Sequence, residues 1–324
     1  MSRLCPFCLL EHDGTECNQG KISLKIPRPY INAVDRRVPV YPLVFIGYKG
    51  CGKTTFLSSL IYSINNLPDS WFSLRPLNQS TISKIEELYI ETLKKGRFPR
   101  PTEGFIEEPL LLELTYRSYS LWELLRNPTR RAILVIYDTM GGAFDQVDSI
   151  ASQLPIIKNT SNLVLLVDLS TFDLSKDNQF IDQTLLNLAT KMALALEELG
   201  SDPRSKNLVV CFTKTDEFWD LNGVGGGFGP LAELPLDTTG HKKNFYRNNI
   251  ISSSRSIQTY LREHYRRFHD FVTENYEGYL FVRSSNIGCK TSDEVVNDAT
   301  VKTFSGDSYN PRGVIDPILW LLSL

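Results

Sequence analysis

Residues 41–54 read YPLVFIGYKGCGKT, and this stretch decides the fold. Its first six residues form an apolar run that is typical of a buried strand. Three glycines fall in the next six positions, where they favour a tight turn. Residues 54–65 then repeat apolar side chains at helical spacing. The stretch predicts a strand, a glycine-rich turn and a helix in immediate succession.

Residues 47–54 fit the phosphate-binding pattern G-x-x-x-x-G-K-[ST] at every fixed position. Glycines let successive backbone amides point at phosphate oxygens, and the helix N-terminus adds partial positive charge. The Lys53 ammonium is expected to stabilise the β- and γ-phosphates during catalysis, and the Thr54 hydroxyl to bind Mg²⁺. The expected nucleotide contacts are Gly47, Lys49, Gly50, Cys51, Gly52, Lys53, Thr54 and Thr55. The alternative is a glycine-rich turn without a ligand.

A carboxylate follows a second apolar run, residues 132–137. Asp138 at that position is expected to hold Mg²⁺ through water, and with Gly141 it forms D-x-x-G, a motif whose glycine amide contacts the γ-phosphate. The alternative is an Asp that caps a turn at a strand end. Thr102 lies in a proline-containing loop before residues 110–116 and is the expected further Mg²⁺ ligand, with an ordinary loop threonine as the alternative.

A third apolar run, residues 208–212, precedes Thr213-Lys214-Thr215-Asp216. This is similar to [NT]-K-x-D, in which the carboxylate accepts hydrogen bonds from guanine and the Lys stem packs along the base. Adenine lacks that donor pair, so Asp216 is expected to select guanine. Ser285, after the last strand, is expected to contact the base through a backbone amide. The alternative for the motif at residues 213–216 is a polar turn that closes a strand.

The remaining periodicity predicts an α/β fold with a mostly parallel sheet and helices on both faces. The short connection between residues 110–116 and 132–137 favours an antiparallel pair at one edge. The expected strands are residues 41–46, 110–116, 132–137, 163–167, 208–212 and 279–282, and the expected helices are residues 54–65, 81–95, 175–199, 253–275 and 315–322. Three prolines between residues 21 and 40 argue against a regular helix there. The expected units are a cysteine segment (1–20), a connector (21–40) and the nucleotide-binding domain (41–324).

The assembled motifs resemble the TRAFAC class of GTPases in their small, Ras-like form, over residues 41–324. The chain is also similar to the double-GTPase group of bacterial conflict systems in its long helical stretch after the phosphate loop and its closing segment, residues 316–322. The resemblance implies a switch that controls a partner or effector, including in anti-phage defence. A Ras-like enzyme usually carries Gln after D-x-x-G to orient water, whereas this chain has Gly142. Asp145 or Gln146 would then take that catalytic role, and we expect slow hydrolysis without a partner.

Three cysteines cluster at the start of the chain, at Cys5, Cys8 and Cys17. Thiolates suit Zn²⁺, and His12 would complete a tetrahedral site. The alternatives are a disordered tail with free thiols, or a fourth ligand supplied by a partner chain.

The formal net charge of −2 gives no general attraction to nucleic acid or anionic membranes. The arginines of residues 253–275 fit an amphipathic surface helix better than a nucleic-acid site, and the glycine-rich loop 219–252 is the better guess for partner contact. Without a membrane span or a secretory signal, a cytoplasmic protein is expected. The leading interpretation is a GTPase. The alternatives are a nucleotide-binding scaffold with little hydrolysis, or an ATPase of another P-loop class.

Overall fold

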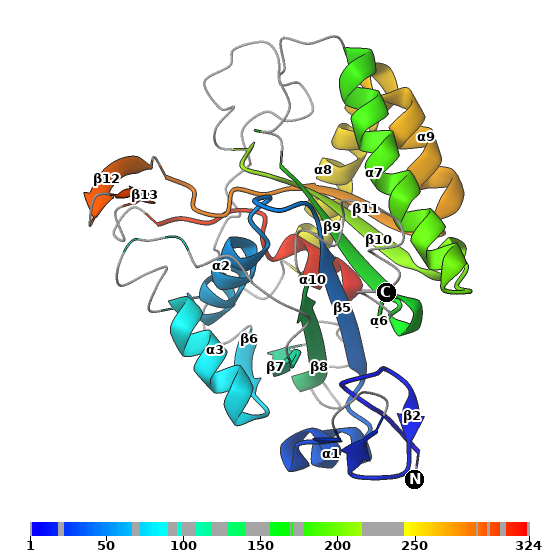
Figure 1. Ribbon diagram of the computed structural model, residues 1–324, viewed down its shortest axis with the longest axis vertical. Coiled ribbons are helices and arrows are strands. Elements are labelled where there is room, and N and C mark those ends of the chain that lie inside the picture. Colours follow the sequence, from blue (N-terminus) through cyan, green and yellow to red (C-terminus); the bar gives the residue numbers. More distant parts are fainter. Residues whose placement is uncertain are drawn as a thin grey trace.

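The chain folds around a seven-stranded β-sheet with the strand order β11-β10-β9-β5-β8-β7-β6 (Figure 1). The computed structural model describes residues 2–18, 23–66, 72–89, 96, 98, 108–117, 129–139, 156–168, 170, 178–215, 243–289, 291–296, 299–304 and 309–322. The strands are β5 Val40–Ile46, β6 Phe72–Pro76, β7 Leu110–Arg117, β8 Thr129–Asp138, β9 Asn162–Asp168, β10 Asn207–Thr213 and β11 Gly278–Arg283. Each of the six expected strands is present, and the protein is an α/β protein.

Most of the sheet is parallel. β5 pairs in parallel with β8 on one side and β9 on the other, and β10 pairs in parallel with β9 and β11. β7 runs antiparallel to both β8 and β6, so the expected antiparallel pairing is confirmed. The expected edge strand lies one position inside the sheet, because β6, which the sequence pattern does not predict, forms the edge.

Ion pairs across three strands fix this edge. Glu113 of β7 is buried, and its carboxylate pairs with Arg75 of β6 and Arg131 of β8. Because a buried carboxylate needs compensating charge, the two arginines hold β6 and β8 in register with β7.

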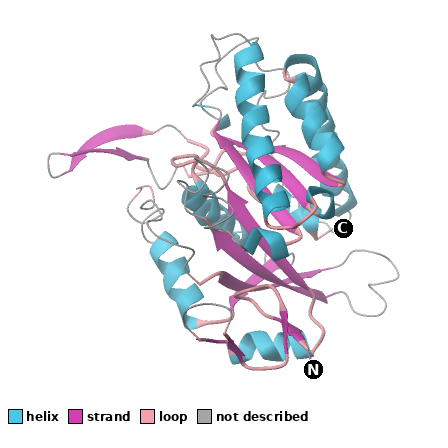
Figure 2. Cartoon of the chain, turned by 45° about the vertical axis from the view of Figure 1, so that its right-hand side comes forward, coloured by secondary structure: helices cyan, strands magenta, loops and turns pink. Residues whose placement is uncertain are grey.

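Helices cover both faces of the sheet (Figure 2). α7 (Asn178–Glu198) and α9 (Arg266–Asn275) share one core with the short helix α6 (Ile156–Asn159). α2 (Lys53–Asn66), α3 (Gln79–Tyr89) and α10 (Asp316–Leu321) build the core on the opposite face. α8 (Lys243–His264) packs against β11 and contributes Ile250 to one core and Ile257 to the other. The sheet is therefore buried on both sides, as its continuous apolar strands predict.

The helix predictions hold best at helix ends that are set by local sequence. α7 ends where expected: the Gly200 amide donates to Glu197 O at 2.8 Å and Ser201 N to Leu196 O, with a φ of +71° at Gly200. The first residues of the expected helix 175–199 and the last of the expected helix 81–95 lie outside the described residues. The single helix predicted over 253–275 is wrong, because α8 already begins at Lys243, inside the loop expected at 219–252, and the helix breaks at Tyr265.

The N-terminal segment is a small folded layer. It contains β1 (Arg3–Leu4), β2 (Glu11–His12), β3 (Glu16–Cys17), β4 (Leu24–Lys25) and α1 (Arg28–Asp35). The expectation of no helix between residues 21 and 40 is wrong. Pro27 and Pro29 stand at and just after the start of α1, where the first amides have no helical partner and proline is tolerated, and Pro39 follows the helix. Buried side chains of this segment join the core of α7 and α9.

A β-hairpin follows the last sheet strand. β12 (Ser292–Val296) pairs with β13 (Ala299–Thr303), and the hairpin projects from the body of the protein in both views (Figures 1 and 2). A short 3-10 helix, η4 (Pro203–Ser205), connects α7 to β10.

Candidate functional site

The candidate site lies where the order of strands reverses. The chain leaves β5 toward β6, β7 and β8 on one side, and later returns to β9 on the other. In open α/β sheets, ligands bind outside the carboxyl ends of strands at such a switch point. The carboxyl end of β5 carries the expected phosphate loop, and the neighbouring strands end in Asp138, Asp168 and Thr213.

Glycine is required in the glycine-rich loop of residues 47–54 for two separate reasons. Gly50 and Gly52 both have φ of +86°, a backbone conformation that other residues rarely adopt. At Gly47 a side chain would instead collide with its surroundings, since a Cβ there would lie 2.7 Å from Leu166 O of β9. The loop is thus closely packed at its start and exposed at its tip, where Lys49 and Gly50 are solvent-exposed.

The Lys53 side chain curls back over this loop. Its ammonium donates to Gly47 O at 2.7 Å and to Tyr48 O at 3.2 Å, and the residue is only 7% exposed. Cys51 Sγ lies 3.7 Å from the same nitrogen, and burial raises the pKa of the Cys51 thiol. The Lys53 ammonium therefore places a positive charge in the loop next to uncharged partners, and this arrangement suits an anionic ligand.

Thr54 and Asp138 meet at the first turn of α2. The Thr54 hydroxyl donates to Asp138 Oδ2 at 3.3 Å, across 84 residues of sequence. Asp138 is buried, and the next residue, Thr139, donates its hydroxyl to Phe45 O of β5 at 2.6 Å. The ends of β5 and β8 are thereby tied together. The sequence reasoning did not identify Thr139.

Each residue of the turn after β10, from Thr213 to Thr215, contacts a different part of the chain. Thr213 donates its hydroxyl to Cys51 O of the glycine-rich loop at 3.1 Å. Thr215 donates its amide and hydroxyl to Ser284 O at 3.3 and 3.1 Å. Between them, Lys214 has a φ of +56° and an ion pair of 2.5 Å with Asp168. Asp168 was also missed, although a carboxylate directly after the predicted strand 163–167 was the same signal that pointed to Asp138.

Residues after β11 form hydrogen bonds to the glycine-rich loop and to α2. Asn286 donates to Gly52 O at 3.4 Å, and Ser59 of α2 donates to Asn286 O at 2.5 Å. Ser285 is fully buried, and its amide donates to Arg312 O at 3.0 Å. The contact expected between the Ser285 amide and a base would therefore require this bond to open.

Several expected site residues cannot be placed. Thr102, Gly141, Gly142, Gln146 and Asp216 lie outside the described residues. Thr55 lies inside α2, where it is buried and accepts the Ser59 hydroxyl through its carbonyl at 2.7 Å.

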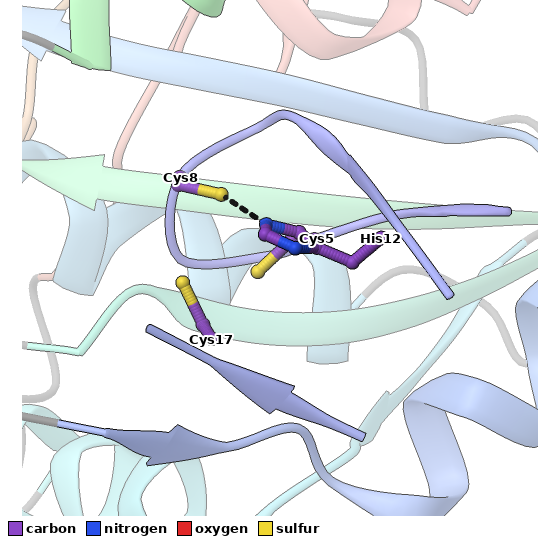
Figure 3. Close-up of side chains that lie close together, drawn as sticks. All are labelled: Cys5, Cys8, His12 and Cys17. Carbon is purple, nitrogen blue, oxygen red and sulfur yellow. Dashed lines mark hydrogen bonds between the residues drawn. The ribbon is translucent and has the colours of Figure 1, made fainter. Parts of the chain in front are cut away.

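A second cluster lies in the N-terminal segment. The ligand atoms of Cys5, Cys8, His12 and Cys17 all lie within 4.8 Å of one another, and their side chains converge in front of the sheet (Figure 3). Cys8 Sγ is 3.0 Å from His12 Nε2. Zinc–sulfur bonds of about 2.3 Å place tetrahedral ligands roughly 3.8 Å apart, so small side-chain shifts would complete a site. The four residues fit a structural zinc ion.

Burial without a metal disfavours charge in this cluster. It raises the pKa of Cys5 to about 12 and also raises the pKa of Cys8. A divalent cation would reverse this preference by stabilising the thiolates. The Phe7 amide donates to Cys5 Sγ at 3.4 Å, a contact that stabilises a thiolate more than a thiol.

The ligand-bearing loop is anchored on the main sheet. Tyr137 of β8 donates its hydroxyl to Pro6 O at 2.5 Å, and Asn159 donates to Cys8 O at 2.8 Å. Within the segment, Tyr30 of α1 donates to Leu4 O at 2.7 Å. The cluster is therefore attached to the α/β unit by hydrogen bonds from β8 and α6.

No helix in the described part of the chain is long and apolar enough to span a membrane.

No protein-family model matches the chain, and no curated protein matches it significantly. The functional case therefore depends on the arrangement of these side chains.

Proposed function

We propose that the protein is a Mg²⁺-dependent, Ras-like P-loop GTPase that acts as a switch on a partner. The observation that carries this proposal is the contact between the Thr54 hydroxyl and the Asp138 carboxylate at the switch point of the sheet. Two oxygen ligands from separate elements converge there, next to a glycine-rich loop that opens a helix. This combination suits a nucleotide with a bound divalent ion.

In the proposed reaction, water attacks the γ-phosphorus of GTP, the bond to the bridging β–γ oxygen breaks, and GDP and phosphate leave. Lys53 would exchange its loop carbonyls for phosphate oxygens and stabilise the charge that develops on them. Bound Mg²⁺ would neutralise charge on the β- and γ-oxygens. Thr54 and Asp138 would position it, and the loop amides would hold the phosphates.

Guanine selection is part of the proposal and depends on the turn after β10. Thr213 and Thr215 anchor this turn to the phosphate loop and to Ser284, and Asp216 is the next residue in the sequence. A preference for guanine separates this proposal from an ATPase of another P-loop class. Multiple-turnover hydrolysis separates it from a scaffold that binds nucleotide without turning it over.

Titration calorimetry of the full chain with GTP, GDP and ATP tests the assignment. We expect guanine nucleotides to bind at least tenfold more tightly than ATP, and magnesium to strengthen binding of GTP. Thr54→Ala should remove most of the magnesium effect, whereas Ser63→Ala, on the same helix, should retain it. Equal affinity for ATP and GTP would refute the guanine site, and absence of any nucleotide binding would refute the whole proposal.

A second proposal concerns the N-terminal cluster. We propose that Cys5, Cys8, His12 and Cys17 bind one structural zinc ion, since their ligand atoms already lie together. Protein purified without added metal should contain close to one zinc per chain, and Cys8→Ser should lose it. A zinc-free protein that is stably folded would refute this proposal.

A further inference from the structure

The carboxyl end of β9 carries a carboxylate that the proposed chemistry does not use. Asp168 is buried, with a side chain only 4% exposed, and its Oδ2 lies 2.5 Å from Lys214 Nζ. Its other oxygen, Oδ1, accepts the Ser170 amide at 2.9 Å and the Ser170 hydroxyl at 2.6 Å. Hydrogen bonds on both oxygens fix the plane of this carboxylate, and hence the direction from which Lys214 can reach it.

The backbone at Lys214 is held in an unfavourable conformation. Its φ of +56° is left-handed, a conformation that brings the Cβ of an L-residue too close to the following carbonyl oxygen. Such strain persists where the surroundings over-determine the conformation, and it is frequent at ligand sites. Here the residues on both sides are anchored, Thr213 to Cys51 O and Thr215 to Ser284 O. The ion pair with Asp168 then determines where the Lys214 side chain goes.

The pair lies beside the phosphate loop. Asp168 and Thr213 are direct neighbours in the β9–β10 register, and Thr213 itself bonds to the phosphate loop. The Lys214 side chain remains 33% exposed, so part of it is available for contact. Its ammonium is bound to Asp168 and also donates to Ser170 Oγ at 3.3 Å, so its charge is compensated.

From these contacts we propose that Asp168 is a positioning residue for nucleotide recognition. It holds Lys214 across the ends of β9 and β10, so that the aliphatic stem of Lys214 forms one wall for the purine base. This inference rests on the proposed guanine site and deepens it. Because the ammonium is neutralised by Asp168, the pair acts on the base and leaves phosphate binding to Lys53 and the loop.

The competing explanation is an ion pair that only stabilises the fold. The two explanations differ in which ligand they affect. A structural ion pair would weaken binding of every ligand through loss of the folded site. A base-positioning pair affects GDP, but not a ligand that has phosphates and no base, such as inorganic tripolyphosphate.

The experiment uses the full chain and calorimetric titration of GDP, ADP and tripolyphosphate in the presence of Mg²⁺. Asp168→Asn keeps the shape of the side chain and removes its charge. We expect its Kd for GDP to rise about tenfold, equal to about 1.4 kcal/mol, with an unchanged Kd for tripolyphosphate. Lys214→Met should give a similar loss, and the double variant should lose little more, because both changes break one interaction.

Asp202→Asn is the matched control. Asp202 is also an aspartate that accepts a backbone amide, that of Arg204 at 2.9 Å. It lies before the amino-terminal end of β10, whereas Asp168 lies at the carboxyl end of β9. It should leave the Kd of all three ligands unchanged. If Asp168→Asn fails to fold, Lys214→Met carries the same test, since that side chain is partly exposed.

The outcomes separate this inference from the proposed function. If the wild type prefers GDP to ADP but both variants bind GDP normally, the inference is wrong and the proposed function stands. Equal losses for GDP and tripolyphosphate would also overturn the inference, in favour of a structural role. If the wild type shows no preference for GDP, the guanine site is wrong and the inference falls with it.

Discussion

Replacing Tyr137 by Phe tests whether the cysteine segment is an integral layer of the α/β unit. The Tyr137 hydroxyl donates to Pro6 O at 2.5 Å. Pro6 is buried and lies between Cys5 and Cys8 in the sequence. Burial raises the pKa of Tyr137, so the hydroxyl remains protonated and can donate throughout the accessible pH range. The variant keeps the ring and removes only this donor.

The loss leaves a buried carbonyl without its hydrogen bond, which costs about 1–3 kcal/mol, and we expect about 2 kcal/mol. With an unfolding entropy of about 2.1 cal/mol/K per residue, a chain of 324 residues has about 0.7 kcal/mol/K at its midpoint. The expected fall in Tm is therefore about 3 °C, measured by calorimetry or by circular dichroism.

Tyr279→Phe is the control for this prediction, because Tyr279 is a half-buried tyrosine of β11 that packs against the same core. It should change Tm by less than about 1 °C. A chelator should then remove less stability from Tyr137→Phe than from the wild type, because the loop has already lost its hydrogen bond to β8. An unchanged Tm in Tyr137→Phe, or identical effects of the chelator on both proteins, would refute this account of the segment.

Three further predictions concern stability elsewhere in the chain. Asp182→Ala should lower the unfolding free energy by about 1–2 kcal/mol in urea titration, because Asp182 accepts the Phe268 amide at the start of α9 at 2.9 Å; no loss would contradict this capping role. Burial raises the pKa of Asp316 to about 7 in the folded protein, whereas the pKa of an unfolded aspartate is about 4. Between these two values the unfolded chain loses the proton while the folded protein keeps it. Wild-type stability should therefore fall as pH rises from about 4 to 7. Asp316→Asn should flatten that part of the pH profile, and an unaltered profile would count against it. Gly288→Ala should destabilise the fold more than Gly50→Ala, although both have positive φ, because only at Gly288 would the new Cβ meet a backbone oxygen, at 1.7 Å; equal melting temperatures would contradict this.

The strands could be predicted where burial is complete. β9 reads NLVLLVD, is buried at every position, and differs sharply from the polar residues around it. β6 reads FSLRP, alternates between half-buried and exposed side chains, and ends in proline. Its strand conformation depends on pairing with β7 and on the Arg75–Glu113 ion pair, and neither can be recognised in five residues of local sequence.

The two helix errors have different origins, one local and one in a contact between distant residues. Proline argues against a helix only in a helix interior, and at the start of α1 it disrupts no helical hydrogen bond. The break at Tyr265 has neither glycine nor proline to announce it. Asp182 of α7 stabilises the new start by accepting the Phe268 amide, so the boundary depends on packing between α7 and α9.

The site could be predicted in parts but not as an assembly. The phosphate-loop pattern, Asp138 and the turn after β10 are each visible as short motifs at strand ends. The pairing of Lys214 with Asp168 is not, because it requires β9 and β10 to be neighbours with Thr213 beside Asp168. Strand order follows from the whole sheet, and no single motif encodes it.

β8 connects the two candidate sites, because successive side chains of a strand point to opposite faces. Tyr137 faces the cysteine segment and is hydrogen-bonded to Pro6, and the next residue, Asp138, accepts a hydrogen bond from Thr54 in the first turn of α2. Thr139 then ties the strand end to Phe45 O of β5. Three consecutive residues thus have partners in three different parts of the chain. Asp138 therefore lies between a residue bonded to the cysteine segment and a residue bonded to β5, and this one stretch of chain connects the two candidate sites.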